Sequence, residues 1–257
     1  MNKNLLNEQV SPFDSRDYLV EAIVHPEQEY PETLDYRPDL PPAWDQGKDG
    51  PCSAFTVAAM KMWQEKKDIG LTEDLSPYFV YNFRKNRPQS GMYPRDTMQI
   101  LKHKGIPRKK LYKKSWLSEG DIPEKVLKEA QNHRISGYAK VTTVEGLKKS
   151  LFKHGPAYIS MPVYNGSMNF WYKRRGEEML GGHAILVVGY NKGGFILRNS
   201  WGTKWGDKGH TVYPYSHFGS HWEIWTAIDD TSEHLLPVSK SYKGSIWSKI
   251  KSYIKNR

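Results

Sequence analysis

The chain changes character near residue 134. Before that point the pattern is helical, most clearly in residues 52–67, whose apolar side chains cover nearly the whole circumference of a helix. After it come short β-branched or aromatic runs bounded by glycine and proline, at 135–141, 157–163, 184–190 and 194–199. Helices followed by strands, rather than the two in alternation, predict an α+β fold with two lobes.

Two shorter helices are marked by their ends. Ser76 and Pro77 suit the N-cap and the first position of a helix. Residues 96–104 form a second helical pattern, which Gly105 stops.

Composition narrows the class of protein. The 257 residues are 38% hydrophobic and 26% charged, with a formal net charge of +10. We find neither an apolar run long enough to span a membrane nor an N-terminal signal peptide, and we expect a cytoplasmic protein or a component of a viral particle. The single cysteine excludes an internal disulfide and zinc or iron–sulfur sites built on several cysteines of one chain, so we expect no cofactor.

The two ends of the chain differ from its middle. Residues 1–40 contain too many prolines for a helix and predict an extended N-terminal arm. Residues 231–257 carry lysines beside an apolar stripe at helical spacing, which predicts a basic amphipathic tail. Such a tail suits docking on a protein assembly or an anionic surface. With no recognisable nucleic-acid module, we expect no specific nucleic-acid binding.

Cys52 has two interpretations. A lone cysteine is most often a small buried hydrophobic residue. At the start of a helix, however, the positive end of the helix dipole stabilises a thiolate, which favours a nucleophile of lowered pKa. A nucleophile also needs a base, a group that orients the base and a donor to the oxyanion.

Two downstream blocks and one upstream block supply those groups. His183 opens an apolar run, and Asn199 is followed by Ser-Trp-Gly, at offsets of 131 and 147 residues from Cys52. Gln46 precedes Cys52 by six positions. In this order and at this spacing, residues 35–230 resemble the papain-like cysteine peptidases.

The resemblance implies a papain-like two-lobed fold, with a helical lobe at about 45–133, a β-barrel-like lobe at about 134–230 and the active-site cleft between them. It makes Cys52 the nucleophile and His183 its base. Asn199 orients His183, Gln46 donates to the oxyanion, and Trp201 shields the Asn199–His183 hydrogen bond. The implied activity is that of a cysteine endopeptidase, a hydrolase.

The resemblance also implies where a polypeptide substrate binds. Gly91 presents its backbone to an extended peptide, Tyr93 and Pro94 border the pocket for the second substrate residue, and Gly182 leaves room beside His183. The alternative for residues 90–94 is an ordinary glycine–proline loop.

Some positions depart from the family pattern. Pro51 replaces a small residue and Ser53 an aromatic one, as in cysteine-poor bacterial and phage relatives with short prosegments. Residues 12–17 resemble an element of those prosegments, so the arm is expected to border the cleft. The alternative function is a structural or interaction protein of the same fold, for example in a phage particle, with little or no peptidase activity.

Overall fold

The computed structural model describes residues 6–25, 27, 29–48, 50–113 and 117–229. Its α-helices are α1 (Cys52–Ile69), α2 (Pro77–Asn82), α3 (Pro94–His103), α4 (Glu124–Gln131) and α5 (Val144–His154). Its strands are β1 (Leu34–Asp35), β2 (Gly137–Val141), β3 (Ala157–Val163), β4 (Gly181–Asn191), β5 (Gly194–Arg198), β6 (His210–Pro214) and β7 (Glu223–Ile228). Short 3₁₀ turns lie at Val20–Ala22, Arg37–Asp39, Glu119–Asp121 and Tyr215–His217. The predicted C-terminal tail lies outside the described residues.

The central helix α1 is buried along most of its length and forms where the apolar pattern predicts it. It ends at Gly70, whose left-handed φ of 69° allows the backbone to cap the last turn. Its first residue follows Pro51, which supplies no side-chain cap. As in every α-helix, the first N–H groups of α1 have no intrahelical acceptor. In α2 the Ser76 hydroxyl accepts a hydrogen bond from the Phe79 N–H, which confirms the predicted cap.

The strands form one sheet in the order β2–β7–β3–β4–β5–β6, with β1 paired to β4. Strand β3 has the predicted bounds, while β4 begins three residues before the predicted run and thereby includes His183. This lobe was expected to resemble a β-barrel, and its antiparallel sheet is present but is not a closed barrel. A barrel requires its two edge strands to pair. Here β2 and β6 stay at opposite ends of an open sheet.

Helix α5 and strands β6 and β7 were not predicted from the sequence. Strand β7 joins the sheet by pairing with both β2 and β3, and α5 packs against β3, β4 and β7. A helix thus lies within the strand-rich half, but the chain keeps the α+β character that was predicted.

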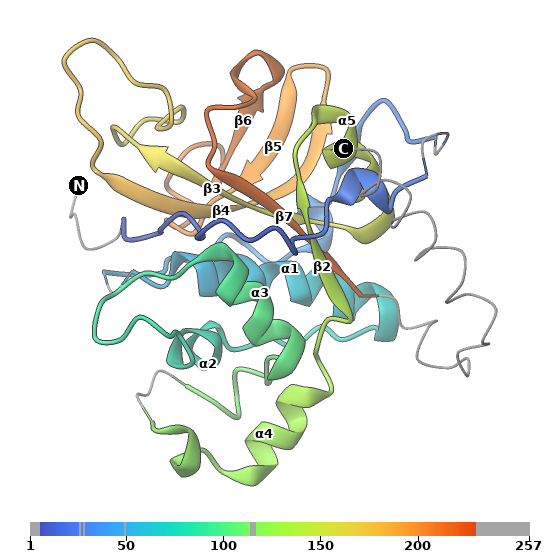
Figure 1. Ribbon diagram of the computed structural model, residues 1–257, viewed down its shortest axis with the longest axis vertical. Helices are drawn as coiled ribbons and strands as arrows, with labels where there is room; N and C mark the ends of the chain where they lie inside the picture. The colour runs from blue at the N-terminus through green and yellow to red at the C-terminus, as the bar shows by residue number, and fades with distance from the viewer. Residues whose placement is uncertain (1–5, 26, 28, 49, 114–116, 230–257) are drawn as a thin grey trace.

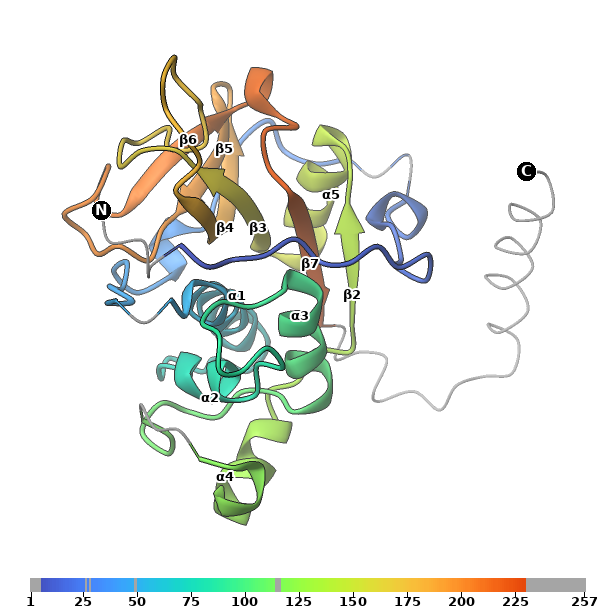
Figure 2. The ribbon, with the colours of Figure 1, turned by 60° about the vertical axis from the view of Figure 1, so that its left-hand side comes forward.

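The helices α1–α4 lie on one side of the sheet, as Figures 1 and 2 show. Helix α1 packs against β4, so its first turn lies beside the strand that carries His183. Both views show the dark blue N-terminal segment running between the sheet and helices α1 and α3. None of the helices in the described ranges is both long and apolar enough to cross a membrane.

Candidate active site

Cys52 is the first residue of α1 and is completely buried. The chain reaches it through Gly50, whose φ of 76° is left-handed and suits glycine. Backbone hydrogen bonds from Ala184 and Ser53 reach the thiol. Because Ala184 directly follows His183, packing of α1 on β4 brings the predicted nucleophile to the strand position of the predicted base.

His183 is oriented by Asn199, which follows β5. His183 Nε2 lies 2.8 Å from Asn199 Oδ1. The same Oδ1 accepts the Ser200 N–H at 2.7 Å, so Nε2 must be the donor in the His183 pair. Nδ1 of the neutral ring is then a free acceptor, and it has no hydrogen-bond partner among the described residues. This leaves Nδ1 available to take the thiol proton.

Trp201 covers this pair. Its ring stacks on the His183 ring with centroids 4.6 Å apart and an interplanar angle of 24°. The ring lies where a shield for the His183–Asn199 hydrogen bond would be needed, and the shielding role of Trp201 stays a prediction. A direct contact of Trp201 with substrate stays a prediction.

Gln46 presents an unused donor. Its amide oxygen accepts from the Ser200 hydroxyl, which fixes the orientation of the amide. Its Nε2 is buried without a partner among the described residues. A buried donor without an acceptor is costly unless something binds it. A developing oxyanion is a group of the right charge, and Ser200 is the residue that aims the donor, a role that sequence reasoning did not assign.

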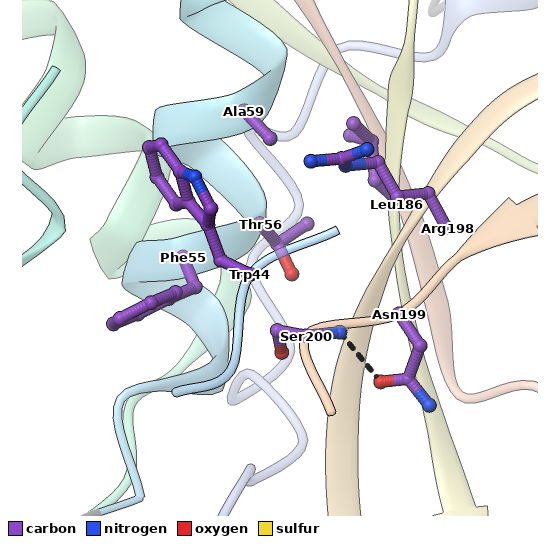
Figure 3. Close-up of a pocket in the computed structure, with 8 residues that line it drawn as sticks. All are labelled: Trp44, Phe55, Thr56, Ala59, Leu186, Arg198, Asn199 and Ser200. Carbon is purple, nitrogen blue, oxygen red and sulfur yellow. Dashed lines mark hydrogen bonds between the residues drawn. The ribbon is translucent and has the colours of Figure 1, made fainter. Parts of the chain in front are cut away.

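A small pocket lies directly behind these residues, between α1 and the end of β5 (Figure 3). Arg198 extends from β5 toward α1, and its guanidinium donates to the Pro42 carbonyl at 2.9 Å. Burial lowers the pKa of Arg198 to about 10. The pocket is lined by Trp44, Phe55, Thr56, Ala59, Leu186, Arg198, Asn199 and Ser200. Cys52 is not among these lining residues.

Part of the N-terminal arm lies across Cys52. We call residues 6–11 the cleft segment. Its Glu8 N–H donates to the Gly182 carbonyl at 3.2 Å, and the Gly182 N–H donates to the Leu6 carbonyl at 3.2 Å. On the other side the Gln9 N–H donates to the Met92 carbonyl at 3.1 Å. The segment therefore bridges the sheet and the loop before α3 as an extended peptide.

The glycines predicted to line the substrate cleft lie against this segment. A Cβ on Gly91 would fall 1.8 Å from the Asn7 carbonyl oxygen, and one on Gly182 would fall 2.3 Å from the Glu8 carbonyl oxygen. Tyr93 and Pro94 open α3, as its N-cap and first residue. Their role beside the pocket for the second substrate residue stays a prediction.

Comparison with known proteins fits this geometry. The sequence model of the papain family cysteine proteases matches residues 30–218. The chain belongs to the papain family of cysteine proteases. It is 29% identical to mouse cathepsin K over 77% of this chain and 64% of that protein. It is 27% identical to cysteine proteinase 3 of Entamoeba histolytica over 70% of this chain and 61% of that protein. The chain thus spans about three fifths to two thirds of the length of these curated relatives.

Solved structures of this family share the fold. Xylellain, a cysteine protease from Xylella fastidiosa, superposes with a TM-score of 0.76 at 24% identity, over 89% of this chain and 97% of that one. The ragweed pollen allergen Amb a 11, a cysteine protease solved in its proform, superposes with a TM-score of 0.67 at 19% identity. That match covers 81% of this chain and 68% of the other.

In this papain-family chain the covered thiol is not activated. Burial and the neighbouring Glu8 carboxyl raise the pKa of Cys52 well above its usual range. The prediction of a lowered pKa is therefore wrong for the covered site, because desolvation disfavours the thiolate more than the start of α1 stabilises it. Burial likewise lowers the pKa of His183 to about 4, so the ring is neutral at pH 7.

Nothing in the sequence pattern marked Glu8 as part of the site. It is only 3% exposed, although acidic residues are seldom buried without a partner. Its carboxyl group hydrogen-bonds to the Ser53 and Tyr158 hydroxyls and lies 3.7 Å from Cys52 Sγ. Ser53 was noted only as a departure from the family pattern. Nothing marked Tyr158, because a tyrosine in a buried strand is ordinarily a core residue.

The described residues contain no cluster of three or more histidine, cysteine or acidic side chains that could hold a metal ion.

Proposed function

We propose that this protein is a cysteine endopeptidase whose active site is closed by its own N-terminal arm, which acts as a short prosegment. The division into an arm (1–40), a peptidase domain (41–230) and a tail (231–257) is part of this proposal. The observation that carries it is the pair of groups that are buried and unpartnered among the described residues, His183 Nδ1 and Gln46 Nε2. Both are buried, and each has the hydrogen-bonding character that acyl transfer requires.

Catalysis begins once the cleft segment leaves. His183 Nδ1 takes the Cys52 proton, and the resulting thiolate attacks the carbonyl carbon of the scissile peptide bond. The negative charge that develops on the carbonyl oxygen is bound by Gln46 Nε2 and by the Cys52 N–H, which has no intrahelical acceptor. Asn199 keeps the imidazolium oriented throughout.

The intermediate then collapses with loss of the amine. His183 returns its proton to the leaving nitrogen, which leaves an acyl group on the Cys52 sulfur. A water molecule, deprotonated by His183, attacks this thioester and releases the carboxylic acid and the thiol. The cycle consumes one water and one peptide bond, and it needs no cofactor.

The substrate would lie extended along the path now taken by the cleft segment. Gly182 and Met92 already offer backbone groups to that segment from opposite sides. Extended peptides are commonly bound through main-chain hydrogen bonds of this kind. Gly91 and Gly182 have no side chain that would block them.

The test is digestion of a peptide library by the full chain, with products identified by mass spectrometry. Wild type should produce new peptide termini, and Cys52→Ala should produce none, because the chain has no other thiol. Equal product sets from both proteins would overturn the proposal. A folded wild type that cuts nothing even after arm removal by limited proteolysis would favour the alternative, a structural or interaction protein.

A further inference from the structure

The contact between Glu8 and the floor of the cleft is a polar site inside an otherwise apolar region. Tyr158 lies on β3 and Ser53 on α1, and both are fully buried. Their neighbours in the core include Ala54, Ala184 and Leu186. We call the two hydroxyls of Ser53 and Tyr158 the seat. Each hydrogen-bonds to a different oxygen of the Glu8 carboxyl group.

Among the described residues, no cationic side chain hydrogen-bonds to the Glu8 carboxyl group or is among the main influences on its pKa. The groups that shift the pKa of Glu8 are its burial, the hydrogen bonds from Ser53, Tyr158 and Cys52, and the charge of Glu223. Glu223 lies on β7 and is itself held by the Ser11 N–H at 2.5 Å and the Trp225 indole N–H at 2.9 Å. On β4, His183 is neutral at pH 7 because its pKa is lowered to about 4.

A charged side chain is therefore disfavoured in the seat. Burial, with the charge of Glu223, outweighs the hydrogen bonds from Ser53, Tyr158 and Cys52 and raises the pKa of Glu8 to about 8, so the carboxyl group holds its proton there at pH 7. An apolar side chain is disfavoured for a different reason, because it would remove the hydrogen bond that each buried hydroxyl makes to residue 8 and leave the hydroxyls only their contacts with each other and with Cys52. A neutral group with both an acceptor and a donor matches the seat best.

We propose that the seat formed by Ser53 and Tyr158 is a side-chain subsite that selects an uncharged carboxamide, so that preferred substrates present glutamine at this position of the cleft. This rests on the proposed peptidase function. Glutamine has the length of Glu8 and the shape of its protonated form. Its amide oxygen accepts from one hydroxyl while its NH₂ donates to the other.

The seat can be tested in the full chain without knowing a substrate. The rate at which iodoacetamide alkylates Cys52, followed by intact mass, measures how well the side chain at position 8 keeps the cleft closed. The signal is specific because Cys52 is the only thiol in the chain. Glu8→Gln should alkylate at least as slowly as wild type at pH 7. Glu8→Leu should alkylate at least about tenfold faster, because both hydroxyls lose their hydrogen bonds to residue 8. Faster alkylation of Glu8→Gln than of Glu8→Leu would overturn the proposal.

The pH dependence gives a second reading. Below about pH 4.5 the Glu8 carboxyl is protonated whether seated or free, and between 4.5 and 8 only the seated group keeps its proton. Its contribution to closure is therefore full at low pH and is lost as the pH rises through about 8. The alkylation rate of wild type relative to Glu8→Gln should rise over that range. A constant ratio would contradict the neutral-group preference.

A double-mutant comparison separates the seat from general packing. In a Ser53→Ala, Tyr158→Phe background the order should invert, with Glu8→Leu alkylated more slowly than Glu8→Gln. If the order of the two residue 8 variants stays the same in both backgrounds, the hydroxyls do not select the side chain and the proposal fails.

Peptide cleavage completes the test and keeps the two proposals distinguishable. The full chain is given sets of peptides that differ at a single position, with glutamine, leucine or glutamate there. At one of the positions tested, the glutamine peptide should be cut with a higher kcat/KM than the leucine and glutamate peptides. Tyr158→Phe should remove that preference, so that the ratio of kcat/KM for the glutamine peptide to kcat/KM for the leucine peptide falls toward one. If no peptide is cut, the proposed function fails while the alkylation series still measures the seat. If peptides are cut without a glutamine preference, only the seat proposal fails.

Discussion

The buried ion pair between Asp17 and Arg95 should control how often the arm opens. Arg95 Nε and Nη2 donate to the two Asp17 carboxylate oxygens at 2.7 and 2.6 Å, and Arg95 Nη1 donates to the Pro12 carbonyl at 2.6 Å. The two side chains are only 13% and 11% exposed. Asp17 belongs to the arm and Arg95 to α3, so this pair holds the arm just beyond the cleft segment.

The size of the effect follows from that burial. Removing one partner of a fully buried pair costs about 3–5 kcal/mol, and removing one from an exposed pair costs about 0–1 kcal/mol. For a pair with roughly a tenth of its surface exposed, and with Glu223 still near Arg95, we expect Asp17→Asn to cost about 1–3 kcal/mol. Since about 1.4 kcal/mol is a factor of ten, the arm should open roughly ten to a hundred times more often.

The assay is the alkylation rate of Cys52 in the full chain at fixed pH, under conditions in which the arm opens and closes faster than the reagent reacts. Asp14→Asn is the matched control. Asp14 also pairs with an arginine, Arg16, but that arginine side chain is 88% exposed and the pair stays within the arm. The control should alter the rate less than about twofold. Equal rates in Asp17→Asn and wild type, with both folded, would refute the anchoring role of the pair.

Further predictions concern the catalytic groups. Gln46→Ala should lower kcat by about 10²–10³ through loss of one oxyanion donor, with KM little changed; unaltered kcat would place the oxyanion elsewhere. Asn199→Ala should lower kcat less, because Trp201 still stacks on the His183 ring, and a loss as large as that of His183→Ala would contradict this. Deleting residues 234–257 should leave hydrolysis of a small peptide unchanged while weakening binding to acidic vesicles or to a partner assembly; loss of small-peptide turnover would make the tail part of the catalytic fold.

Much of the fold could be predicted from the sequence, because local sequence patterns determine where several of its helices and strands form. Burial around the whole helix defines α1, and the Ser76 cap with Pro77 defines the start of α2. Strand β3 is a continuous apolar run between two loops. The open form of the sheet could not be predicted in this way. Closure depends on whether the edge strands β2 and β6 pair, and no local sequence pattern determines that pairing.

The site likewise has features that could be predicted from the sequence and features that could not. The positions of Cys52, His183, Asn199 and Gln46 were predicted because their motifs carry fixed spacing. The arm was expected to border the cleft, but the contact of Glu8 with the buried thiol was not predicted, because it depends on where Glu8 lies after the arm folds back. An acidic residue in a segment without periodicity gives no sign of burial. The raised pKa of Cys52 is a consequence of that long-range contact.

The most direct test of the account is the alkylation rate of Cys52 at pH 6 in the Asp17→Asn chain, compared with the same chain carrying His183→Ala. An isolated thiol has a pKa near ~8.5 and is almost wholly protonated at pH 6, whereas a thiolate paired with imidazolium is not. The account predicts that opening the arm lets His183 take the thiol proton, so His183→Ala should slow alkylation roughly a hundredfold. Equal rates with and without His183 would contradict it, because Cys52 would then be an ordinary thiol beneath a displaced arm.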